Sequence, residues 1–143
     1  MSEAVVMPRP RKLRIVLVDD EWHMIQLLKM YITEWFSEVE LLPFQNGDWA
    51  WDALSRSEPD LLITDWRHPG LNGGELVRKL AEKKSQVPVL MISASDTDII
   101  RELDGLGIKI FYLQKPFGIR QFWLALNELV GPCDHPPRLP SFV

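Results

Sequence analysis

The chain has 143 residues, the length of a single domain, and its 46% hydrophobic and 25% charged residues are typical of a globular protein. A net charge of −4 argues against a nucleic-acid-binding surface, which requires clustered Lys and Arg. The single cysteine, Cys133, excludes an intramolecular disulfide and a multi-cysteine zinc site. No apolar run approaches the ~18 residues that span a bilayer, and the N-terminus does not resemble a signal peptide, so we expect a cytoplasmic protein without membrane contact.

Short apolar runs alternate along the chain with longer stretches of helical character. In chain order, the predicted elements are a strand over Leu13–Val18, a helix over about 22–36, a strand over Val39–Phe44, a helix over 48–56, a strand over Leu61–Thr64, a helix over 73–84, a strand over Val87–Ile92, a helix over 97–106, a strand over Ile108–Leu113 and a helix over 118–130. Turn-forming residues such as Asn46-Gly47-Asp48 separate them.

The strand-length runs are continuously apolar, which is typical of strands buried on both faces of a parallel sheet. Strands that alternate with helices of this size form βαβ units. We therefore predict an α/β fold with a doubly wound, five-stranded parallel sheet, in one domain over 13–130. The Pro-rich ends are predicted to be an N-terminal tail over 1–12 and a C-terminal tail or linker start over 131–143.

Polar residues that can take part in metal binding or catalysis follow four of the predicted strands. Asp19 and Asp20 follow the first, Asp65 the third, Ser93 the fourth and Lys115 the fifth. Because the carboxyl ends of parallel strands meet at one edge of a sheet, these side chains should converge there. A lone Asp after a strand is most often a helix cap or a turn residue, but five such residues together favour a site. Packed carboxylates stay ionised only if a cation offsets their repulsion, and oxygen ligands suit Mg²⁺.

Four parts of the chain resemble the receiver domains of two-component response regulators. They are Val16–Glu21 with its acidic pair, Leu61–Asp65 followed by Pro69–Gly73, Val87–Ala94 and Tyr112–Phe117. The resemblance covers about residues 12–130 and is to stand-alone members of the chemotaxis-regulator type. It implies a flavodoxin-like (βα)5 fold with strand order 2-1-3-4-5, and a phosphoprotein of phosphorelay signal transduction.

The resemblance also implies a role for each site residue. Asp65 would be the nucleophile that accepts a phosphoryl group as an aspartyl phosphate. Asp20 and Asp65 would bind Mg²⁺ directly, Asp19 mainly through water, and the backbone carbonyl of Arg67 would be a further ligand. Lys115 would pair with Asp65 and then neutralise the phosphoryl oxygens. Such catalysis consists of positioning and charge neutralisation, so no separate general base is required.

A switch and two partner surfaces are implied in the same way. The hydroxyl of Ser93 is expected to bond the phosphoryl group, and Tyr112 to rotate as Ser93 moves. A histidine kinase or histidine phosphotransfer protein is expected to dock on helix one and on the loop Lys115-Pro116-Phe117. A downstream protein is expected on the face formed by helix four, strand five and helix five, and a homodimer is an alternative use of that face.

The sequence also bears on three alternatives: an aspartyl phosphatase, a flavodoxin-like nucleotide binder and a receiver fragment. An aspartyl phosphatase would carry a second Asp two residues after the nucleophile, where this chain has Arg67, so we expect no enzyme beyond self-catalysed phosphorylation and dephosphorylation. A flavodoxin-like nucleotide binder would need a Gly-rich or Ser/Thr-rich loop where this chain has Asp19-Asp20-Glu21. The remaining alternative is a receiver fragment of a longer regulator with a missing output domain.

Three features depart from the family pattern. Arg67 and His68 stand where many receivers carry small or aliphatic residues. The Arg67 side chain either acts on the phosphodonor or Mg²⁺ or is a solvated loop residue, and His68 has no role that the sequence assigns. One or two extra residues lie between Gly107 and Tyr112, so we expect helix four or the loop after it to be altered.

Overall fold

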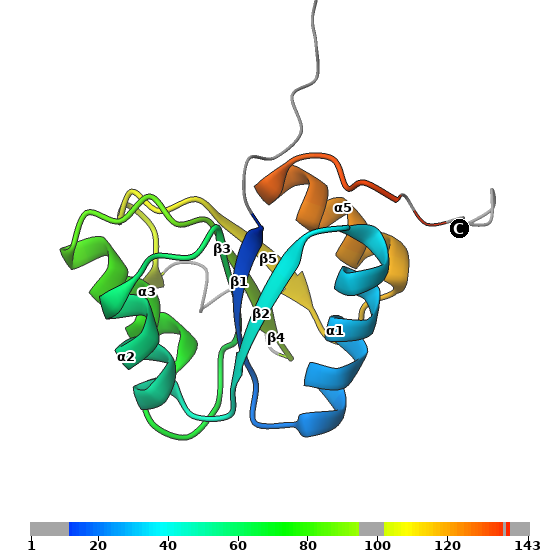
Figure 1. Cartoon of the computed structure of the whole chain (residues 1–143). Coiled ribbons are helices and arrows are strands. Elements are labelled where there is room, and N and C mark those ends of the chain that lie inside the picture. The colour runs from blue at the N-terminus through cyan, green and yellow to red at the C-terminus, as the bar shows by residue number, and fades with distance from the viewer. Residues whose placement is uncertain (1–11, 95–101, 136, 138–143) are drawn as a thin grey trace, which may run out of the picture.

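The computed structural model describes residues 12–94, 102–135 and 137. The elements within them are β1 (Leu13–Val18), α1 (Trp22–Trp35), β2 (Val39–Phe44), α2 (Gly47–Arg56), β3 (Leu61–Asp65), α3 (Gly73–Glu82), β4 (Val89–Ser93), β5 (Ile110–Gln114) and α5 (Ile119–Val130). The strands form one parallel sheet in the order β2-β1-β3-β4-β5, which confirms the predicted flavodoxin-like topology. Helices α1 and α5 cover one face of this sheet and α2 and α3 cover the other (Figure 1).

Strands β4 and β5 each begin two residues later than predicted. At β4 the reason is Pro88, which has no N–H to donate to the ladder. Residues 97–101, the first half of the helix predicted over 97–106, lie outside the described part of the chain. After Glu102, the described residues 103–107 form turns and bends, with Gly105 and Gly107 at positive φ.

The register of the sheet aligns the strand ends that carry the polar residues. Val18 pairs with Thr64, Asp65 with Ile92, and Ser93 with Gln114. The residues that end or follow these strands therefore lie along a single edge, as expected for a parallel sheet.

Each helix buries one apolar stripe against the sheet. On α1 and α5 the buried residues recur every three or four positions, the spacing of one helical face. They are Ile25, Leu28, Ile32 and Trp35 on α1, and Phe122, Ala125, Leu126 and Leu129 on α5. Burying a large side chain of this kind contributes roughly 1.5–3 kcal/mol. No helix of the described residues is long and apolar enough to cross a bilayer.

The first residues of the predicted C-terminal tail are held on the domain. The indole N–H of Trp123 lies 3.1 Å from the sulfur of Cys133. The amide of Ser37 donates to the carboxylate of Asp134 (2.9 Å), and the amide of His135 donates to the carbonyl of Trp35 (2.9 Å). The segment 131–135 thus runs from the end of α5 to the end of α1.

Candidate functional site

Hydrogen bonds from backbone amides fix the acidic pair after β1. The amide of Asp19 donates to the carbonyl of Phe44 on β2 (3.1 Å). The Asp19 carboxylate, only 1% exposed, accepts a hydrogen bond from the amide of Glu21 (2.8 Å). This turn buries Asp19 and leaves Asp20 exposed at the edge of the sheet.

The three carboxylates among the four predicted metal ligands come together. One carboxylate oxygen from each of Asp19, Asp20 and Asp65 lies within 4.8 Å of the others. This donor set consists of oxygens alone and comes from the ends of two adjacent strands. Such a set fits a hard divalent cation, and Mg²⁺ in particular where phosphate is a partner.

Lys115 reaches this cluster from the end of β5. Its ammonium nitrogen lies 2.9 Å from Oδ2 of Asp65, 3.7 Å from Oδ2 of Asp19 and 3.9 Å from Oε1 of Glu21. Burial alone would lower the pKa of Lys115, but its hydrogen bond to Asp65 and the three carboxylates outweigh burial, so the pKa is raised. The lysine therefore stays protonated beside the proposed phosphoacceptor.

The charge balance of the cluster remains unfavourable without a cation. The pKa of Asp19 is raised from 3.8 to about 6, mainly because the carboxyl group is buried and also because the carboxylates of Asp65 and Asp20 are close. The amide of Glu21 and the ammonium of Lys115 oppose this rise and offset only part of it. A divalent cation would supply the missing positive charge.

Ser93 and Tyr112 lie on neighbouring strands. Ser93 is buried at the end of β4, and its carbonyl accepts a hydrogen bond from the amide of Lys115 (2.8 Å). Tyr112 pairs with Met91 in the sheet, and its half-buried ring packs with the cluster beneath α2 and α3. Burial and the charge of Asp104 raise the pKa of the Tyr112 phenol, so the ring is neutral at physiological pH.

The loop between β3 and α3 forms the other side of the site. A polar pocket of about 440 Å³ is lined by Asp20, Arg67, His68, Pro69, Gly70 and Asn72. Arg67 is exposed there, while His68 is half-buried and bonded to the hydroxyl of Thr64 (3.0 Å). Thr64 was not among the predicted site residues, although a polar residue within an otherwise apolar strand was a signal. Glu21, whose carboxylate faces Lys115, was not predicted either.

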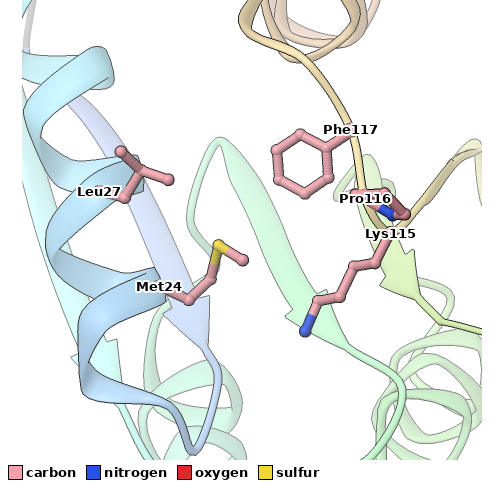
Figure 2. Close-up of a pocket in the computed structure, with 5 residues that line it drawn as sticks. All are labelled: Met24, Leu27, Lys115, Pro116 and Phe117. Carbon is pink, nitrogen blue, oxygen red and sulfur yellow. The ribbon is translucent and has the colours of Figure 1, made fainter.

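A second, apolar pocket of about 420 Å³ lies on the α1 side. Met24 and Leu27 of α1 face Lys115, Pro116 and Phe117 across it (Figure 2). The peptide bond between Lys115 and Pro116 is cis. The helix-one surface and the Lys115–Phe117 loop, which were predicted to dock the same partner, are thus two walls of one pocket.

A parallel sheet of this order, with an acidic cluster and a paired lysine at its carboxyl edge, defines a receiver domain. The chain belongs to this family, since the model of the response regulator receiver domain matches residues 15–127.

Individual relatives agree with this assignment. A CheY homologue of Campylobacter jejuni, named as a chemotaxis protein, is 32% identical over 124 residues, which are 83% of this chain and 93% of that protein. The transcriptional regulatory protein TcrA of Mycobacterium tuberculosis is 34% identical over 88% of this chain, but the match spans only 50% of TcrA. The structure of the chemotaxis protein CheY4 of Vibrio cholerae superposes with a TM-score of 0.71 at 20% identity, over 82% of this chain and 98% of that one.

Proposed function

We propose that this chain accepts a phosphoryl group on Asp65 from a histidine kinase or a histidine phosphotransfer protein, in a reaction that requires Mg²⁺. The observation that carries the proposal is the 2.9 Å contact between Lys115 and Asp65 inside a cluster of three carboxylates. A structural ion pair would not need two further carboxylates beside it, because each one adds repulsion.

Asp19, Asp20 and Asp65 would hold the Mg²⁺, with the backbone carbonyl of Arg67 as a further ligand. Bound there, the cation would neutralise charge on the phosphoryl oxygens during transfer. The site could instead be read as a proton-sharing carboxylate cluster, but the protonated Lys115 and the exposed Asp20 favour a site that is open to a cation and a phosphate.

The residues of the chain itself perform the transfer. A carboxylate oxygen of Asp65 attacks the phosphorus in line with the leaving group, so that an O–P bond forms as the P–N bond of the phosphohistidine breaks. The electron pair of that bond returns to the imidazole nitrogen. Lys115 moves its contact from Asp65 to the phosphoryl oxygens, and the hydroxyl of Ser93 donates to one of them. Water later cleaves the acyl phosphate, so the modification is transient and the chain is no enzyme in the usual sense.

The partner surfaces follow from the positions of the two pockets and the switch residues. We propose that the phosphodonor protein packs on the apolar pocket of Met24, Leu27 and Phe117, which opens beside Lys115. Output is proposed to run from Ser93 through Tyr112 to the face of β5 and α5, by contact with a downstream protein or a second copy of the chain, in the cytoplasm. The same roles hold if the domain is part of a longer regulator.

Intact-mass measurement tests the proposal most directly. The chain is incubated with Mg²⁺ and acetyl phosphate, and one added phosphoryl group is expected. Asp65→Asn should show no added mass, and chelation of the Mg²⁺ should have the same effect on the parent. An unmodified mass for the parent under saturating donor would refute a working phosphoacceptor.

A further inference from the structure

Hydrogen bonds hold the loop that closes the site, residues 66–72, at Trp66, at Pro69 and at Leu71, whose amide donates to the carboxylate of Asp48 (3.1 Å). At its start the amide of Trp66 donates to the carbonyl of Ile92 (2.9 Å), while the carbonyl of Trp66 accepts from the amide of Gly73 (2.9 Å). Further along, the carbonyl of Pro69 accepts from the amide of Gly47, at the start of α2 (2.8 Å). The short stretch between Trp66 and Pro69 crosses the mouth of the site.

His68 lies in this stretch, and its ring is held by contacts with Thr64 and Gly47. Its Nε2 lies 3.0 Å from the hydroxyl of Thr64, which also lies 2.8 Å from the carbonyl of Asp65. The neighbouring ring atom, Cε1, lies close to Gly47, where an added Cβ would come within 2.9 Å of Cε1 and would overlap the backbone of the loop at Leu71. The Thr64 hydroxyl donates to the Asp65 carbonyl and can accept from Nε2–H, while Nδ1 of the ring lies 3.4 Å from the carbonyl oxygen of Pro69.

The location of this contact gives it a consequence for the metal site. Thr64 is fully buried and immediately precedes Asp65, so its hydroxyl is tied to a rigid strand. The carbonyl of Arg67 belongs to the peptide unit that joins Arg67 to His68. Because a peptide unit is planar, holding His68 restricts the direction in which that carbonyl points.

We propose that His68 is a positioning residue for the metal: anchored by Thr64 and seated against Gly47, its ring holds the Arg67 carbonyl toward the pocket that Asp20 and Arg67 line. This proposal rests on the proposed function, since it concerns the same Mg²⁺ site. The ring itself is not a ligand. It acts through the backbone, much as partners behind a metal ligand commonly change affinity by about 10-fold or more.

Mg²⁺ titration of the full chain, followed by tryptophan fluorescence, tests the proposal. His68→Leu removes the ring nitrogens, and Thr64→Val removes only the hydroxyl from a side chain of the same shape. Each variant should bind Mg²⁺ about tenfold more weakly than the parent. The double variant should be no weaker than either single one, because both substitutions break the same bond. His68→Gln, whose amide nitrogen can take the place of Nε2, should recover most of the loss.

A matched control comes from the far end of the molecule. The ring of His135 makes a similar bond with the hydroxyl of Ser37 (2.8 Å), at the end of α1. His135→Leu should leave Mg²⁺ affinity unchanged. Thermal unfolding in chelator checks that each variant is folded before titration.

The outcomes separate this inference from the proposed function. A parent chain that binds Mg²⁺ and takes a phosphoryl group, with His68→Leu equal to it in affinity, overturns the positioning role alone. Losses that multiply in the double variant would do the same, because they would show that the two residues act independently. A parent that neither binds Mg²⁺ nor becomes phosphorylated removes both proposals.

Discussion

The indole of Trp66 occupies the space that a side chain at Gly74 would need. A Cβ on Gly74 would come 2.5 Å from Cη2 and 2.9 Å from Cζ3 of the ring. Trp66 itself is only 9% exposed, so the ring has little freedom to move aside. The first turn of α3 is therefore packed directly on the residue that follows Asp65, the proposed phosphoacceptor.

Gly74→Ala is the first test of this packing. Within a helix the change from Gly to Ala normally stabilises by about 1 kcal/mol, but here the clash should reverse the sign and destabilise by roughly 1–3 kcal/mol. Urea unfolding gives the free energy, and Trp66 fluorescence reports the displaced ring. Trp66→Phe lacks the outer ring atoms, so Gly74→Ala should cost less in that background. An equal cost in both backgrounds would place the strain elsewhere.

The second prediction concerns pH. In chelator the folded chain binds a proton on Asp19 below about pH 6, whereas the unfolded chain does so only near 3.8. The folded state thus holds more protons in this window, so the free energy of unfolding should fall as pH rises from about 4 to 6 and stay low above it. Asp19→Asn should remove this dependence and stabilise the metal-free chain at pH 7 by up to roughly 3 kcal/mol. If the free energy of unfolding changes with pH equally in the parent and in Asp19→Asn, the prediction is wrong.

Mg²⁺ should stabilise the fold, because it binds only the assembled carboxylates. At a concentration about 100 times its Kd the expected gain is roughly 2.7 kcal/mol, seen as a rise in Tm. Asp20→Asn should lose most of the gain, since its side chain is one of the three that converge. A similar gain in Asp20→Asn would mean that the metal binds at another place.

Arg67 should act in opposite directions before and after phosphorylation. Arg67 lines the same pocket as Asp20 and is permanently positive, so it should weaken the binding of a divalent cation there. A phosphoryl group brings about two negative charges, and the same guanidinium then becomes attractive. Arg67→Met should therefore bind Mg²⁺ more tightly and lose phosphate faster, each by more than about twofold. Fluorescence titration measures the Mg²⁺ affinity and timed dephosphorylation the rate of phosphate loss. If neither changes, Arg67 is only a solvated loop residue.

The apolar pocket should matter for protein donors alone. Leu27 is a pocket wall that is 38% exposed, so Leu27→Asp should cost little stability while placing a charge on the surface proposed for the donor. Phosphotransfer from a histidine kinase should slow at least tenfold, whereas acetyl phosphate, which needs no docking, should react as before. Leu124→Asp, at a leucine on α5 that is 45% exposed, is the control. Equal slowing with both donors would indicate damage to the active site instead.

Much of the site could be predicted because parallel strands impose it. Once Asp19, Asp65 and Lys115 are placed just at or after strand ends, the sheet brings them together whatever the loops do. The contact of His68 with Thr64 could not be predicted in this way, since the path of a loop depends on packing against Gly47, far away in the sequence. The start of β4 was predicted too early for a local reason. The apolar run begins at Val87 and continues through Pro88, but Pro88 has no N–H to donate to the hydrogen bonds of the sheet.

The segment 131–135 has a practical consequence for experiments. The contacts of His135 with Trp35 and Ser37 put it just before the amino end of β2. The segment therefore lies by the edge of the sheet where β1 and β2 begin, opposite the edge where the strands end (Figure 1). The strands between these edges are five or six residues long, or roughly 17–20 Å. A dye or surface linker attached at position 135 would therefore leave both pockets free, and single-molecule measurements of donor binding could be made through that attachment.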